Sequence, residues 1–254
     1  MRVLVCVKRV PMTGGTIVLT DDARAIETRH LGFTISPHEE CGVEEAVRLI
    51  EANGGSSTVL TLRPPEAEEQ LRDCMALGID RAIHLLADDE FDGQATARAI
   101  VEAIAREGAA GTEYDIVFFG NESADAGNFQ VGIRVAYALG WPCVTGVKAV
   151  ALEDGGLRLE QEVPGGRDVY RVPLPAVVTV KEGLNLPRYP SVPGRLRAKK
   201  KPLESSTPER GAQGVEKVRL AVPADEGAQT EVLGRGPDAA PAVVELLERI
   251  GVVG

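Results

Sequence analysis

The feature that most constrains the fold of this chain is a regular alternation of short apolar runs with amphipathic helical stretches. Apolar runs at residues 3–7, 57–62 and 114–119 have the length and composition of strands that are buried on both faces. Between them, apolar residues recur at the i, i+3, i+4 and i+7 spacing of a helix. A further strand is expected at 81–86. This alternation, over roughly the first 180 residues, predicts an α/β fold with a doubly wound, mostly parallel sheet.

Capping residues mark the expected helix starts. Ser36 precedes Glu39 by three residues, which is the spacing of a capping box, and Pro37 occupies the first helical position. Gly54 and Gly55 are expected to end this helix. Further helices are expected over residues 67–77, after Asp92, and between residue 128 and Gly140.

The pattern changes in the second half of the chain. Apolar residues at 144–152 and 157–163 flank an Asp-Gly-Gly turn at 154–156, which predicts a β-hairpin. Two more strands are expected at 168–172 and 176–181. The sheet should therefore end in an antiparallel or mixed portion.

The chain divides by composition near residue 203. Residues 1–203 are expected to form the main α/β domain. Residues 202–214 are polar and contain Pro and Gly, which is typical of a linker. A strand at 215–222 and a helix near 238–250 would complete a C-terminal extension.

Composition limits the classes of function. The chain has 28 basic and 38 acidic residues, a formal net charge of −10 and a pI near 5.0, which argue against nucleic acid as its main partner. No apolar run approaches the ~20 residues of a membrane helix. The apolar stretch at the start is too short for a secretory signal. We therefore expect a cytoplasmic protein without membrane insertion.

The strongest functional signal is the polar stretch 120–131, which follows a buried strand and leads into a helix. In an open parallel sheet, the ligand crevice lies at the carboxyl ends of the strands, where this stretch must sit. Gly120 and Gly127 let the backbone approach a ligand closely, and the N–H groups at a helix start suit a phosphate. Asp125 could accept hydrogen bonds from ribose hydroxyls. The stretch therefore favours a nucleotide site, and an ordinary polar strand–helix loop is the alternative.

Motifs of known enzyme classes are missing. The sequence has no G-x-G-x-x-G after its first strand, no Walker loop and no G-x-S-x-G. His30, His38 and His84 are far apart and the four cysteines are scattered, so we expect neither a catalytic triad nor a metal site. A nucleotide-hydrolysing or nucleotide-transferring α/β enzyme is the competing hypothesis. The stretch 120–131 has no phosphate-binding lysine and no acid–base cluster, so we expect a protein that is not an enzyme.

A basic segment follows the last expected strand. Residues 181–201 carry seven basic residues against one acid, Glu182, and contain three prolines. A nucleic-acid tail and a solvated run of charge are both possible interpretations. The interleaved apolar residues favour a protein-docking loop near 183–201 with an electrostatic approach. These apolar residues are Leu184, Leu186, Val192 and Leu196.

Five segments resemble the β subunit of electron transfer flavoprotein, over residues 1 to about 203. They are residues 7–10 (VKRV), 44–49 (EEAVRL), 75–85 (MALGIDRAIHL), 120–132 (GNESADAGNFQVG) and 184–203 (LNLPRYPSVPGRLRAKKKPL). The last segment is similar to the signature of that family.

The resemblance implies a function. Proteins of this family are heterodimers whose α subunit carries most contacts to a redox-active FAD, while the β subunit binds AMP. The dimer accepts electrons from primary dehydrogenases, notably the acyl-CoA dehydrogenases of fatty acid oxidation. It passes them towards the quinone pool through a quinone-linked oxidoreductase. The extension at 204–254 would then contact the α subunit.

The resemblance also implies AMP-binding residues. They lie at the end of the first strand, at the first helix start, after the next strand, and in the long glycine-started loop. Matched one by one, they are Cys6, Ser36, Pro37, His38, Glu39, Arg63, Gly120, Asn121, Glu122, Ser123, Ala124, Asp125, Ala126, Gly127, Asn128, Phe129, Gln130 and Val131.

The chain departs from the family pattern at several positions. Residues 36–39 read SPHE where the family has a segment resembling NPFC, so His38 replaces an aromatic residue near the flavin. Pro11, Met12 and Thr13 stand where the family often has an aromatic or acidic side chain facing the flavin. A branch of the family binds a second FAD in place of AMP and bifurcates electrons, and this alternative stays open.

Overall fold

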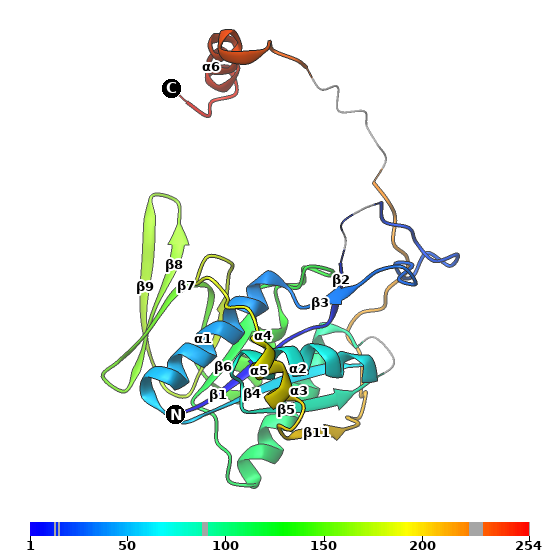
Figure 1. Cartoon of the computed structure of the whole chain (residues 1–254), viewed down its shortest axis with the longest axis vertical. Coiled ribbons are helices and arrows are strands. Elements are labelled where there is room, and N and C mark those ends of the chain that lie inside the picture. The colour runs from blue at the N-terminus through cyan, green and yellow to red at the C-terminus, as the bar shows by residue number, and fades with distance from the viewer. Residues whose placement is uncertain (13, 15, 88–90, 224–230, 254) are drawn as a thin grey trace.

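The computed structural model describes residues 1–12, 14, 16–87, 91–223 and 231–253. Within them, one nine-stranded sheet has the order β11-β5-β4-β1-β6-β10-β7-β8-β9 (Figure 1). Its strands are β1 (Arg2–Cys6), β4 (Ser56–Arg63), β5 (Arg81–Leu86), β6 (Ile116–Gly120), β7 (Cys143–Glu153), β8 (Gly156–Val163), β9 (Gly166–Pro173), β10 (Ala176–Val180) and β11 (Leu203–Ser206). Two short strands, β2 (Val10–Pro11) and β3 (Phe33–Thr34), pair with each other.

Helices α1 (Pro37–Asn53), α2 (Glu68–Leu77), α3 (Gly93–Ala109) and α4 (Val131–Leu139) cover the two faces of this sheet. The described residues also form α5 (Val192–Ala198) and α6 (Ala240–Arg249), with 3₁₀ turns η1 (Pro65–Ala67) and η2 (Gly236–Ala239). Helices α1 and α2 pack on one face, where Val43, Val47 and Leu71 join the core. Helices α3 and α4 pack on the other face through Ile100 and Val135. The predicted doubly wound, mostly parallel sheet is therefore confirmed.

The antiparallel portion grows from β7. The first residues of β7 pair in parallel with β10, and its later residues pair antiparallel with β8. Asp154 and Gly155 both have positive φ, 49° and 77°, which is the backbone of a type I′ hairpin turn between β7 and β8. The predicted hairpin is thus confirmed, and β9 continues it as an edge strand.

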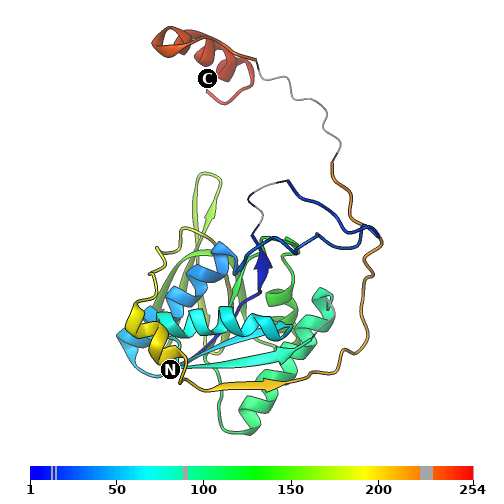
Figure 2. The ribbon, with the colours of Figure 1, turned by 45° about the vertical axis from the view of Figure 1, so that its right-hand side comes forward.

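The C-terminal extension differs from the prediction. The strand predicted at 215–222 is wrong, because among the described residues no strand pairs with this stretch and Val215, Val218 and Val222 are exposed. A strand needs a partner for its backbone groups. The chain instead forms β11 within the predicted linker, parallel to β5. The predicted final helix corresponds to η2 and α6, which Figures 1 and 2 show held apart from the α/β body.

The basic segment contains a helix that the sequence did not predict. Ser191 caps α5, because its Oγ accepts a hydrogen bond from the Gly194 N–H at 3.1 Å, and Pro193 lies in the first turn. Helix α5 packs against α2 (Figure 2). The segment is therefore a folded part of the domain surface.

Candidate functional site

A cleft opens at the carboxyl edge of the parallel strands. The chain runs from β1 to β4 on one side and later enters β6 on the other side of β1, so the strand order reverses at β1. Ligands of open α/β sheets bind at such switch points. We call this cleft the edge cleft. It is lined by Cys6, Val7, Lys8, Glu39, Leu60, Leu62, Arg63, Phe91, Gly93, Thr96, Ile100, Phe119, Gly120, Asn121, Glu122, Ser123, Asn128, Phe129, Gln130, Val131, Gly132 and Thr179.

Part of the edge cleft is an apolar wall. Leu60 and Leu62 come from β4, Ile100 from α3 and Phe119 from β6. Burial, with a smaller contribution from the charge of Glu39, raises the pKa of the Cys6 thiol, so Cys6 stays protonated and behaves as a small apolar group. The cleft has a cavity volume of about 130 Å³ and opens to solvent at its mouth.

The loop at 120–131 supplies the polar part of the edge cleft. Gly127 and Phe129 both have positive φ, 55° and 54°, and turn the chain into α4. Gln130, Val131 and Gly132 line the cleft at the start of α4. In the described structure no side chain caps this helix, so its first N–H groups are available to an anionic ligand.

Two cations stand beside this loop, at the ends of β1 and β4. Lys8 Nζ is 2.6 Å from Asp125 Oδ1 and 3.4 Å from Ser123 Oγ. A guanidinium nitrogen of Arg63 lies 3.9 Å from Asp125 Oδ2. Both carboxylate oxygens of Asp125 therefore face protein cations, whereas the sequence suggested a contact with ribose hydroxyls.

A second pocket, which we call the outer pocket, adjoins the edge cleft. Burial lowers the pKa of His38, which keeps its ring mostly neutral at pH 7. His38 Nδ1 is buried and has no hydrogen-bond partner within the described residues. The outer pocket is lined by Ser36, Pro37, His38, Glu122, Ser123, Ala124, Asp125, Ala126, Gly127 and Glu182.

The start of α1 joins three parts of the site. One oxygen of the buried Glu39 carboxylate accepts hydrogen bonds from the N–H groups of Lys8, at 3.0 Å, and Ser36, at 3.2 Å. Ser36 Oγ accepts a hydrogen bond from the Ala124 N–H at 2.9 Å. The same residues that begin the helix thus hold the loops after β1 and β6 together.

Burial gives Glu39 an unusual titration. Desolvation, together with the charges of Asp125 and Glu40, raises the pKa of Glu39 well above its ordinary value, against a smaller opposing effect of the Ser36 N–H. Because the folded pKa lies above the unfolded one, the folded protein binds this proton more tightly. Its contribution to stability is present below the unfolded pKa and is lost as pH rises through the folded pKa.

We therefore expect Glu39→Gln to gain stability over the wild type as pH rises. The amide keeps an oxygen that can accept both backbone hydrogen bonds but cannot ionise, so the gain at neutral pH should be on the order of 1 kcal/mol. Urea unfolding at pH 5 and pH 8 measures the difference. Glu113→Gln, at an exposed glutamate, controls for the loss of one charge. An equal difference in unfolding free energy between wild type and Glu39→Gln at pH 5 and pH 8 would contradict the prediction.

Comparison with known proteins decides the family. Residues 24–210 match the family of electron transfer flavoprotein domains. The chain belongs to the electron transfer flavoprotein family.

Relatives of this electron transfer flavoprotein chain include several β subunits. It is 34% identical over 206 residues to the electron transfer flavoprotein subunit beta of Bacillus subtilis, which covers 80% of this chain and 78% of that one. It is 32% identical over 256 residues to the human subunit beta, an alignment that covers 99% of this chain and 98% of the human one. It is 34% identical over 233 residues to the subunit beta of Syntrophomonas wolfei, and this alignment covers 91% of this chain and 90% of that one. The resemblance to β subunits found in the sequence is confirmed, and with it a role in electron transfer.

The structure brings the predicted site residues together. Every one of them lines the edge cleft or the outer pocket, and Glu122 and Ser123 line both. Whether they bind a ligand stays a prediction. Asn121 has a further task, because its Oδ1 accepts hydrogen bonds from the Gly146 N–H at 2.9 Å and from Thr179 Oγ1 at 2.8 Å. It therefore ties β7 and β10 to the loop.

Sequence reasoning missed several residues that line the edge cleft. Lys8 carried a signal, since it directly follows the first strand at the predicted sheet edge. Leu60, Phe91, Thr96 and Ile100 carried none, because they resemble ordinary core and helix residues. Thr13, expected near a flavin, lies outside the described residues.

Two negative findings concern the described ranges alone. Over residues 1–12, 14, 16–87, 91–223 and 231–253, no three or more His, Cys, Asp and Glu side chains are grouped to hold a metal ion. No helix there is long and apolar enough to cross a bilayer. The cytoplasmic location stays a prediction.

Proposed function

We propose that this chain is the AMP-binding β subunit of an electron-carrying heterodimer. Its α-subunit partner would contribute most of the FAD site. The dimer would accept electrons from acyl-CoA and other primary dehydrogenases and pass them to a quinone-linked oxidoreductase. The observation that carries the proposal is the edge cleft, which combines an apolar wall, an uncapped helix start and two cations at the switch point of the sheet.

The residues of the edge cleft fit an adenine nucleotide. An apolar wall of Leu60, Leu62 and Phe119 suits the base. The N–H groups at the start of α4 suit the phosphate, and Lys8 and Arg63 can neutralise its charge. A phosphate there would compete with the Asp125 carboxylate for these cations.

The outer pocket fits a role beside the flavin. When bound, FAD supplies the redox chemistry, and the protein supplies orientation and electrostatics. The buried His38 Nδ1 needs a hydrogen-bond partner, which a polar ligand group can provide. A neutral His38 ring places no fixed positive charge in this pocket. The chain would thus bind and orient cofactors without a catalytic residue of its own.

The C-terminal extension supports the heterodimer. Residues 1–203 would form the nucleotide-binding domain and residues 204–254 would contact the α subunit. Helix α6 has no buried residue; Val243 and Val244 are exposed on it, and Ile250 is exposed directly after it. Exposed apolar groups of this kind are typical of a surface that a partner covers.

The basic segment fits docking to a dehydrogenase. Leu186, Val192 and Leu196 are exposed, whereas Leu184 packs against the core. Within the described structure, Arg197, Lys199 and Lys200 form no ion pair, so they are available to steer an acidic partner surface. Arg195 is paired with Asp73 at 2.6 Å. Lys201 donates hydrogen bonds to the carbonyl groups of Met75, Gly78 and Ile79, so it holds the fold and is not available for steering.

Electron transfer from an acyl-CoA dehydrogenase to the assembled heterodimer tests this function. Val192→Ala removes an exposed apolar contact, and we expect kcat/KM to fall roughly fivefold at every salt concentration, as for the loss of about 1 kcal/mol. Replacing Lys199 and Lys200 by glutamine should slow transfer several-fold at low salt and little at high salt. Both variants should keep their cofactors.

The control is Val169→Ala, which removes an exposed valine from β9. It should transfer electrons at the wild-type rate. If the Val192 and lysine variants also match the wild type at all salt concentrations, the basic segment is not the docking surface.

A further inference from the structure

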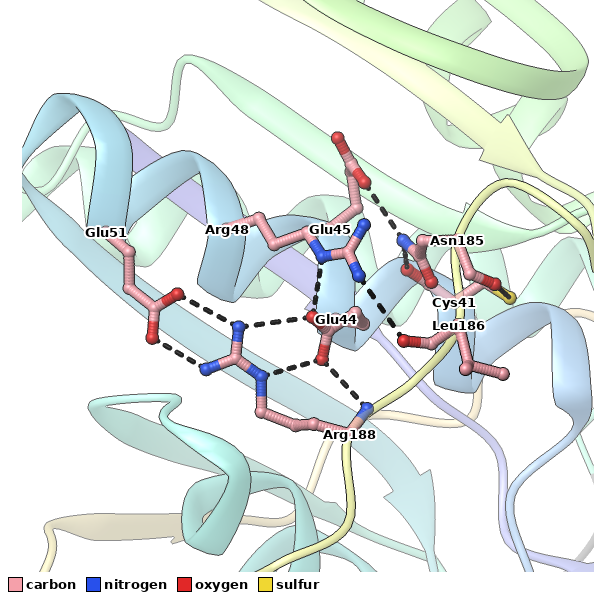
Figure 3. Close-up of polar contacts among 8 residues, drawn as sticks. All are labelled: Cys41, Glu44, Glu45, Arg48, Glu51, Asn185, Leu186 and Arg188. Carbon is pink, nitrogen blue, oxygen red and sulfur yellow. Dashed lines mark hydrogen bonds and ion pairs between the residues drawn. The ribbon is translucent and has the colours of Figure 1, made fainter.

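The basic segment is fastened to α1 by a dense network of polar contacts (Figure 3). Arg188 lies at its centre and pairs with Glu44 and Glu51, which lie about two turns apart on the same face of α1. We propose that Arg188 is a positioning residue for docking to the dehydrogenase. It fixes residues 185–191 so that their exposed apolar side chains meet the dehydrogenase in a preformed arrangement. This inference rests on the proposed docking function.

Arg188 uses its whole guanidinium group. Its Nε and one terminal nitrogen donate to the two oxygens of Glu44 at 2.9 and 3.1 Å. Its terminal nitrogens also donate to the two oxygens of Glu51 at 2.6 and 2.9 Å. The backbone N–H of Arg188 donates to Glu44 at 3.1 Å, so the main chain is fixed as well as the side chain. Two fork-shaped pairings define both position and orientation.

Glu44 is the buried anchor of this network. Burial opposes its ionisation, but the hydrogen bonds from Arg188 and Arg48 outweigh that effect and hold the pKa of Glu44 below its ordinary value. The hydrogen bonds that Arg188 donates to the carboxylates of Glu51 and Glu44 raise the pKa of Arg188. Glu44 and Arg188 are therefore both charged at neutral pH, and their hydrogen bonds are of the stronger, charge-assisted kind.

Neighbouring contacts extend the attachment along the segment. Asn185 Nδ2 donates to the Cys41 carbonyl at 3.0 Å and to Glu45 at 2.9 Å. Arg48, which also pairs with Glu44, donates to the Leu186 carbonyl at 3.4 Å. Figure 3 shows these side chains converging from α1 on the segment. Residues 185–188 are thus bonded to α1 through the Asn185 side chain, the Leu186 carbonyl and the Arg188 N–H.

The side chains beside this attachment point to solvent. Leu186 is 84% exposed and Tyr189 is 95% exposed, although the backbone between them is anchored. Their exposure gains nothing for the folded chain alone, since apolar groups in water do not stabilise a fold. An anchored backbone with free apolar tips lowers the entropy that docking must overcome. The arrangement is what a preformed docking surface requires.

The chemistry requires arginine at this position. A lysine would keep the positive charge but has one compact ammonium group, which cannot pair with two carboxylates in fixed geometry. Arg188→Lys therefore separates charge from positioning. Arg188→Met removes both while keeping an unbranched side chain.

The test uses the assembled heterodimer and an acyl-CoA dehydrogenase. We expect Arg188→Met to raise the KM for the carrier about tenfold with kcat within about twofold of the wild type, because ordering must then occur at docking. Arg188→Lys should give an intermediate KM. Hydrogen exchange of the amides at 184–191 should become at least about tenfold faster, with bound AMP and FAD unchanged.

Two further variants guard against a general effect on folding. Glu51→Ala removes only the outer, exposed half of the pairing and should raise KM less, and combined with Arg188→Met it should add nothing. Arg167→Met breaks an ion pair with Glu160 on the antiparallel portion and should leave KM and exchange unchanged.

The outcomes separate the two proposals. An unchanged KM in Arg188→Met, with KM raised in Val192→Ala, would overturn the positioning role and leave docking intact. A wild-type KM in both variants would overturn docking itself, and the positioning role with it. A fall in kcat with loss of cofactor in Arg188→Met would assign Arg188 to general stability, which also overturns the inference.

Discussion

Thr96→Phe is expected to empty the edge cleft of nucleotide. Thr96 lies on α3 among the lining residues, so an aromatic ring added there would occupy the space proposed for AMP. A ligand that binds only the folded state stabilises it by about 2.7 kcal/mol at 100 times its dissociation constant. Added AMP should therefore raise the unfolding free energy of the wild-type heterodimer by about that amount, and that of Thr96→Phe by almost nothing.

The matched control is Ala105→Phe, which adds the same ring to an exposed position of the same helix. It should retain the full response to AMP. An equal response of Thr96→Phe and the wild type would place the nucleotide elsewhere.

The molecules released from the wild type also decide between two branches of the family. One AMP and one FAD support the proposed carrier, whereas two FAD molecules support a bifurcating β subunit.

Local signals in the sequence were sufficient for most of the fold. The capping residues Ser36 and Asp92 begin helices where the sequence predicts them, and Gly54 and Gly140 end helices. These signals work because each depends on groups within one turn of the chain. The strand predicted at 215–222 failed because a strand depends on a distant partner, which local composition does not reveal.

The candidate site was predictable to a similar degree. The loop at 120–131 could be found because a polar, glycine-containing stretch after a buried strand has a fixed place in a parallel sheet. The pairing of Arg188 with Glu44 could not, since the two residues are 144 positions apart. For the same reason the sequence predicted a docking loop near 183–201 but not the contacts that anchor this segment to α1 and α2.

Gly194→Ala is expected to have the second large effect, a loss of stability, because Gly194 lies where α5 packs against α2. A Cβ placed on Gly194 would lie 2.5 Å from the Ala76 carbonyl oxygen, a distance that requires the helices to separate. Gly→Ala within a helix normally stabilises by about 0.5–1 kcal/mol. At Gly194 we instead expect a loss of about 1–3 kcal/mol, because the added methyl group overpacks a contact with backbone.

Gly108 provides the matched comparison. It lies within α3, and a Cβ there meets nothing within 4 Å. Gly108→Ala should therefore gain about 0.5–1 kcal/mol in urea unfolding while Gly194→Ala loses stability. Equal gains in both variants would show that α5 is free to shift away from α2.

Gly194→Ala should also weaken docking to the dehydrogenase. Val192 is the first residue of α5 and is 74% exposed, so its position depends on how this short helix packs on α2. Displacing α5 moves Val192 while leaving the edge cleft untouched, since Gly194 does not line it. We therefore expect Gly194→Ala to raise the KM for the carrier several-fold, as for the loss of about 1 kcal/mol at an interface, with AMP retained. A destabilised Gly194→Ala variant with wild-type KM would mean that the partner recognises residues 185–191 without α5.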